Sequence, residues 1–206
     1  MKTPLDANTL KLIEDGSRYS AFYEGNLANH LPMALVALDR LGASKEQVST
    51  FAKRYEKKLE PMPAPDGVIT AEMADASLGR PEAFASWILF FESELARTGV
   101  NNTVKRWTSR LLPGVGSFAF HGLIRLAYAV ESGSEKELAR ALASWAASYS
   151  ALGELPSFSQ SPVSPAEALA ALKNDPRFNR RRYTRRRISE QMAEAAADPE
   201  VTRIIT

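Results

Sequence analysis

The chain has 206 residues, of which 45% are apolar and 24% are charged, and this composition excludes disordered, collagen-like and fibrous proteins. It contains no cysteine, which excludes disulfides, thiolate nucleophiles and cysteine-ligated metal centres. His30 and His121 are its two histidines, too few for a zinc site built on three, and we assign no metal site.

The net charge of +2 is unevenly distributed along the chain. Residues 177–187 hold seven arginines and no acid, so the remaining residues together carry −5. We expect this arginine run to dock on the acidic body or on a second subunit, and a nucleic-acid partner is less favoured. Charged residues interrupt the N-terminal segment, and the longest apolar run, 83–91, is too short to span a membrane, so we expect a cytoplasmic protein.

Helical periodicity dominates the sequence along most of its length. Asn29 to Pro32 begin an apolar helix, the capping box of Ser44 and Gln47 begins another, and Pro81 begins a third that ends at Gly99. Further helices are predicted at about 103–112, 117–131, 135–150, 165–173 and 184–197. No alternating β-branched run appears, so we predict an all-α, multi-helical bundle with no sheet.

Proline-containing segments suggest the domain organisation. Residues 61–67 form a stiff connection, and residues 155–165 are polar and rich in proline and serine. We therefore predict a helical core domain over 1–155, followed over 156–206 by a linker and a basic helical arm.

Two stretches of the chain share a pattern. Glycine follows twelve residues after each histidine, at Gly42 and Gly133, and a capped amphipathic helix follows each glycine. This pattern fits a duplicated helical hairpin around an apolar pocket, but chance similarity between amphipathic helices explains it equally well.

The first candidate site lies at Asn29 and His30. Asn29 can cap the helix, which would place His30 near a helix N-terminus, where a neutral imidazole able to accept a proton is favoured. The alternative is a histidine that only satisfies a structural hydrogen bond.

The second candidate site is a strip on one helix, comprising His121, Arg125, Tyr128 and Glu131. The histidine could move a proton while the arginine stabilises an oxyanion. Alternatively, Arg125 and Glu131 belong to structural salt bridges, and Tyr128 is a core aromatic residue.

Gly114 and Gly116 stand directly before a predicted helix, so a cofactor phosphate could rest on this segment. A dinucleotide fold is not expected, because no strand precedes these glycines. Trp87 and Trp145 are candidates for stacking on a flat ligand.

The segments NHLPMALVALDRLGAS and FHGLIRLAYAVESG together resemble the questin oxidase-like family over roughly residues 15–150. The resemblance implies an all-helical protein and, for the named member of the family, an NADPH-dependent Baeyer–Villiger-type oxidation that opens an anthraquinone ring. Arg125 stands where fungal members have a histidine, and those members are longer.

We therefore expect an oxidoreductase acting on an aromatic polyketide or quinone-like small molecule. His30, His121 and Arg125 are the expected catalytic residues, and the substrate contacts are Asn29, Tyr128, Trp87, Trp145 and Glu131. The alternative is a non-catalytic helical module that binds a hydrophobic small molecule or completes its pocket as a homodimer.

Overall fold

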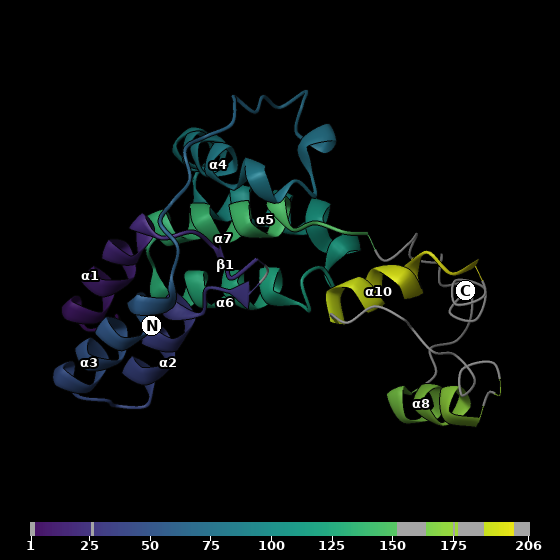
Figure 1. Cartoon of the computed structure of the whole chain (residues 1–206), viewed down its shortest axis with the longest axis horizontal. Coiled ribbons are helices and arrows are strands. Elements are labelled where there is room, and N and C mark those ends of the chain that lie inside the picture. The colour runs from purple at the N-terminus through teal and green to yellow at the C-terminus, as the bar shows by residue number, and fades with distance from the viewer. Residues whose placement is uncertain (1–2, 26, 152–163, 175, 177–187, 200–206) are drawn as a thin grey trace.

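The computed structural model describes residues 3–25, 27–151, 164–174, 176 and 188–199 (Figure 1). The α-helices are α1 (Ala7–Asp15), α2 (Leu31–Arg40), α3 (Lys45–Tyr55), α4 (Phe84–Thr98), α5 (Val100–Leu111), α6 (His121–Ser132), α7 (Glu135–Ala147), α8 (Pro165–Asn174) and α10 (Ile188–Ala196). The 3-10 turns are η1 (Gly16–Arg18), η2 (Glu56–Lys58), η3 (Asp75–Ser77), η4 (Pro81–Ala83) and η5 (Leu112–Gly114). The predicted all-α fold class is confirmed.

Helix α7 lies at the centre of the bundle and contacts α1, α4, α5 and α6. All its residues from Glu137 onwards are buried, and many of them are alanines, so neighbouring helices approach closely. The main core also contains an aromatic cluster from α4 and α5, formed by Trp87, Phe90, Phe91 and Trp107. Gly99 allows the reversal between α4 and α5 at a φ of 77°, as its predicted capping role requires.

A second, smaller core joins α1, α2 and α3. Leu31, Leu35 and Val48 are buried there, and Tyr128 of α6 packs against them. The predicted capping box is present, because the Ser44 and Gln47 side chains each accept the other residue's backbone N–H.

The expectation that the chain contains no sheet is wrong. Strands β1 (Phe22–Tyr23) and β2 (Leu27–Ala28) pair antiparallel, with Phe22 opposite Ala28. Two residues per strand are too few to produce a detectable alternation in the sequence. Left-handed φ angles of 46° at Glu24 and 77° at Gly25 turn the chain between them.

Helix α6 begins at His121, later than the predicted start near residue 117. The three residues before it are not glycines, yet Phe118, Ala119 and Phe120 all have left-handed φ angles, of 51°, 53° and 66°. This conformation cannot continue into a right-handed helix and is strained for L-residues. We call residues 118–120 the left-handed turn.

Helices α2 and α6 contact one another and run in the same direction. His30 faces His121 at their beginnings, and Arg40 forms a salt bridge with Glu131 near their ends, at 2.8 Å. Both pairs are separated by 91 residues in the chain. Residues 91 positions apart therefore meet near both ends of this helix pair, which is compatible with a duplicated unit.

The predicted arm is described over α8 and α10, which lie to one side of the bundle (Figure 1). The arginine run at 177–187 lies outside the described residues, so its docking stays a prediction. The domain boundary near residue 155 also stays a prediction. Within the described ranges, every helix is too short or too polar to cross a membrane.

Candidate functional site

His30 and His121 lie side by side. Their Nε2 atoms are 2.9 Å apart, and their ring centroids are 4.8 Å apart at an interplanar angle of 80°. The tertiary structure thus brings together the two histidines that the sequence singled out.

His30 directly precedes α2, and Asn29 holds this connection in place. Asn29 is 2% exposed; its side-chain amide donates to the Ser20 carbonyl, and its Oδ1 accepts the backbone N–H of Leu31. This satisfies the backbone donor of the first helical residue, but the N-cap residue is His30 and not Asn29 as expected, and the His30 side chain makes no capping hydrogen bond. The backbone N–H of His30 donates to the Tyr55 hydroxyl at 3.2 Å.

The hydrogen bond from His121 Nδ1 to the Phe118 carbonyl, at 2.6 Å, defines its tautomer. A carbonyl oxygen only accepts, so Nδ1 carries a proton and the neutral ring presents an Nε2 lone pair to His30. His30 Nε2–H therefore donates to His121 in the neutral pair. This leaves His30 Nδ1 as the unprotonated nitrogen, 3.5 Å from the Tyr55 hydroxyl oxygen.

The surroundings favour the uncharged forms of His30 and Tyr55. Burial, followed by the proximity of His121 and Arg125, lowers the pKa of His30 below its ordinary value of 6.5, against an opposing effect of the Ala28 backbone. Part of His30 is exposed, but its ring faces His121. Burial raises the pKa of Tyr55 to about 12. His30 is therefore a neutral base and Tyr55 a neutral phenol.

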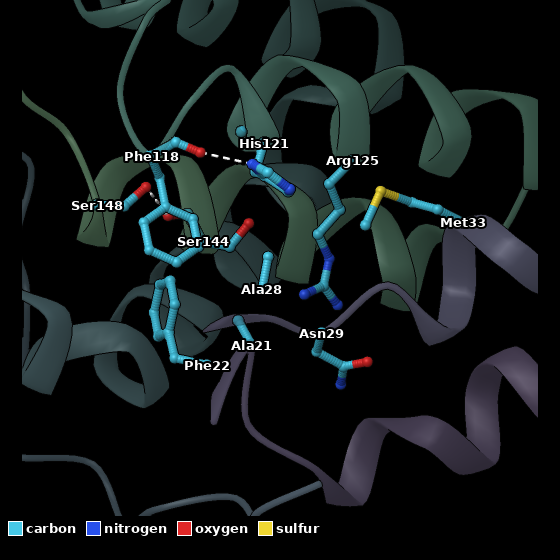
Figure 2. Close-up of a pocket in the computed structure, with 11 residues that line it drawn as sticks. Ala21, Phe22, Ala28, Asn29, Met33, Phe118, His121, Arg125, Ser144 and Ser148 are labelled. Atoms are coloured by element: carbon cyan, nitrogen blue, oxygen red, sulfur yellow. Dashed lines mark hydrogen bonds between the residues drawn. The ribbon is translucent and has the colours of Figure 1, made fainter. Parts of the chain in front are cut away.

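A small cavity adjoins His121, with a volume of about 10 Å³. This is roughly the space of one water molecule. Figure 2 shows the Phe22 and Phe118 rings at one end, with His121 and Arg125 pointing in from α6. The two phenylalanine rings meet edge to face at 5.3 Å between centroids. The expected apolar pocket is thus closed to an aromatic ligand in this conformation.

Arg125 lines this cavity, but its charge is already paired. It is 4% exposed, and Glu137 accepts from its Nε at 2.8 Å and from its Nη2 at 3.2 Å. The buried pair fixes the guanidinium beside Ala28 and Asn29 (Figure 2). Glu137 therefore reduces the charge that Arg125 could offer an oxyanion.

The other predicted ligand contacts are dispersed. Glu131 pairs with Arg40, and Tyr128 packs in the smaller core. Trp87 is fully buried in the aromatic cluster and donates to the Ser77 carbonyl. Trp145 is equally buried, donates to the Gly114 carbonyl, and contacts Gly122, the residue after His121. The structure places none of these four around the cavity.

The glycine segment before α6 has a packing role. A Cβ on Gly114 would come within 2.6 Å of the Tyr149 ring, and Gly116 is buried. Both glycines therefore lie under other residues, without a free backbone surface for a phosphate. They do not fit the cofactor site predicted for them.

Four residues around the site were not predicted as functional: Phe22, Tyr55, Phe118 and Glu137. Tyr55 had a signal, because Tyr55 and Trp145 each stand eleven residues after the serine that caps their helix, Ser44 or Ser134. Glu137 also had one, as an acid three residues before Arg140 on the same helix. Phe22 and Phe118 had none, since their position depends on the hairpin and the left-handed turn.

The Nε2 atoms of His30 and His121 are close enough to share a proton. Across the described ranges, no three histidine, aspartate or glutamate side chains gather closely enough to hold a metal ion.

Comparison with known families gives one match over most of the chain. A family model described as questin oxidase-like matches residues 27–205. The match includes both histidines, the cavity residues from Ala28 onwards and nearly all of the C-terminal arm. No curated protein matches the chain.

Proposed function

The chain belongs to the questin oxidase-like family, and from that premise we propose that it is an oxidoreductase acting on a phenolic, quinone-like aromatic compound. The single observation that supports this is the directed pair formed by His30 and His121, with Nε2 atoms 2.9 Å apart. Such a pair suits the removal of a proton from a ring hydroxyl.

The proton step follows from the tautomers. His30 Nδ1 accepts the proton of a substrate hydroxyl that approaches from the exposed side of His30, next to Tyr55, and this turns His30 into an imidazolium. Its Nε2–H is already directed at the His121 lone pair, so the new charge is stabilised by a hydrogen bond that needs no rearrangement. In the closed conformation the Phe118 carbonyl keeps His121 in the accepting tautomer.

Packing of the rest of the flat substrate beside His121 requires a local opening, because the cavity there, of about 10 Å³, holds no aromatic ring. Separation of the Phe22 and Phe118 rings would enlarge the cavity next to His121. The left-handed turn that carries Phe118 stores backbone strain, which lowers the cost of moving it. The separated rings would then stack on a flat substrate.

NADPH enters this proposal through the family alone. Together with dioxygen it would supply the reducing equivalents and the oxygen atom of a Baeyer–Villiger-type oxidation. Gly114 and Gly116 do not fit this cofactor, so we derive no step through it.

The test is turnover of a panel of hydroxyanthraquinones by the full chain. We expect substrate-dependent NADPH oxidation and oxygen uptake with a product of increased mass, all lost in His121→Ala. NADPH oxidation that is independent of the anthraquinone, or that persists in His121→Ala, would contradict the proposal. Methoxy analogues without a free ring hydroxyl should react much more slowly.

The second candidate is a non-catalytic small-molecule module that acts as a homodimer. It is favoured by the outward face of α6, where Leu123, Ile124 and Val130 are 38%, 42% and 49% exposed. An apolar surface of this kind is typical of an interface, and a second copy would cover it. Ligand-dependent stabilisation without turnover, together with a dimer that Ile124→Asp converts to a monomer, would support this candidate.

A further inference from the structure

A second hollow lies away from the histidines, between the proline connection, α4 and α7. Its volume is about 230 Å³, far larger than the histidine cavity. Met62, Pro63 and Pro65 line one side, while Ile88 and Leu89 of α4 line another. Apolar walls of this kind suit the body of a small organic molecule.

Two cations from α7, Arg140 and Lys136, also line this hollow. Arg140 is 3% exposed, and its Nε is buried without a hydrogen-bond partner among the described residues. Its Nη2 donates to the Tyr19 carbonyl at 2.5 Å, while Glu137 Oε2 lies 3.6 Å from Nε, too far for a good hydrogen bond. A buried guanidinium with so few partners is costly.

The charges around Arg140 do not balance. Arg125, Glu137 and Arg140 form one buried network in which two guanidiniums share one carboxylate. The Glu137 carboxylate accepts hydrogen bonds from Nε and Nη2 of Arg125. Its interaction with Arg140 is therefore the weaker of the two. Burial, followed by repulsion from Arg125, lowers the pKa of Arg140 to about 10. The network therefore carries an excess positive charge in a poorly hydrated place.

We propose that this hollow binds a small organic carboxylate with an apolar body. The carboxylate would lie against Arg140 with Lys136 at the rim, and the apolar body would lie against Ile88, Leu89 and the proline connection. Arg140 recognises the anion through its fixed planar guanidinium, and the walls select against inorganic anions. This site is independent of the histidine pair.

Among the described residues, Glu92 is the one acid that lines the hollow, and its field partly offsets the charge of Arg140. Its side chain is exposed, so water screens it strongly. A carboxylate bound in the hollow would lie against Arg140, which lines it, and would compensate its charge more effectively than the exposed Glu92. Glu92→Gln should therefore tighten carboxylate binding.

The experiment is titration of the full chain with benzoate, benzamide and inorganic phosphate, followed by calorimetry and by the shift in melting temperature. We expect benzoate to bind and stabilise the protein. Benzamide, which lacks the negative charge, and phosphate, which lacks the apolar body, should each bind at least about tenfold more weakly. Equal binding of benzoate and benzamide would overturn the charge assignment. Phosphate binding as tight as benzoate binding would overturn the class of ligand.

Variants locate the site. Lys136→Ala should weaken benzoate binding about three- to fivefold, the effect of one rim charge, and Ala85→Leu should weaken it more by filling the hollow. Lys45→Ala, on α3 beside Asp6, is the matched control and should change nothing. The melting curve of each unliganded variant is measured first, so that a variant that fails to fold is recognised. Benzoate binding that is the same in Lys136→Ala, Ala85→Leu and Lys45→Ala would overturn the proposal.

Discussion

The Nδ1 atom of His121 lies 2.6 Å from the carbonyl oxygen of Phe118, so the residue that closes the cavity also fixes the tautomer of the histidine beside it. Because Phe118 belongs to the left-handed turn, any movement that opens the cavity also acts on that hydrogen bond. Access to the site and the basicity of the histidine pair are therefore coupled in this fold.

Removing either imidazole should abolish turnover without unfolding the protein. His30→Ala and His121→Ala should each lower the rate by about 100-fold or more, the usual contribution of a general base. Their melting temperatures should stay close to that of the wild type, since His30 is exposed and His121 half-buried. Steady-state kinetics and thermal denaturation check this. A parallel large loss of melting temperature in both variants would instead indicate a structural role.

Tyr55→Phe should destabilise the connection before α2. The hydroxyl accepts the backbone N–H of His30 at 3.2 Å, so its loss removes one hydrogen bond and should cost about 1 kcal/mol in the free energy of unfolding. Chemical denaturation measures this cost. Tyr128→Phe, on the half-buried Tyr128 of α6, is the control and should cost less.

Stability should fall when the pH is lowered through the ordinary histidine range. The pKa of His30 is lower in the folded protein than in the unfolded chain, so between these two values the unfolded state binds more protons. The contribution is fully present above a pH of about 6.5 and is lost progressively below it. Thermal melts between about pH 5 and pH 8 should show a shallower dependence in His30→Asn. An unchanged slope would count against the assigned pKa direction.

Glycine substitutions should have opposite effects in the turn and in the following helix. Ala119 has a φ of 53°, where glycine is unstrained, so Ala119→Gly should stabilise the protein by about 1 kcal/mol. Ala127→Gly, at an exposed position of α6, should destabilise it by about 1 kcal/mol. Denaturant unfolding of both variants provides the comparison. Destabilisation by both would show that the turn stores no strain.

Glu137 should be the most sensitive member of the buried charge network. Glu137→Gln leaves two buried guanidiniums uncompensated, whereas Arg125→Met leaves Glu137 with Arg140. We expect Glu137→Gln to cost about 3–5 kcal/mol and Arg125→Met distinctly less. Equilibrium unfolding of the two variants tests which substitution costs more. A larger cost for Arg125→Met would contradict an excess of positive charge in this network.

The sequence by itself determined the features that depend on neighbours in the chain. The cap formed by Ser44 and Gln47, the reversal at Gly99 and the helical periodicity around them arise from hydrogen bonds and backbone preferences within a few residues. The family resemblance rests on the same kind of local pattern and is confirmed by the match over residues 27–205.

The tertiary structure alone decided the site. The 2.9 Å approach of two histidines 91 residues apart, the division of Glu137 between two arginines and the closure of the cavity by Phe22 and Phe118 are contacts between distant segments. No single segment encodes such contacts, because they follow from how α2, α6 and α7 pack. The left-handed turn before His121 belongs with them, since its backbone strain persists only where surrounding packing imposes it.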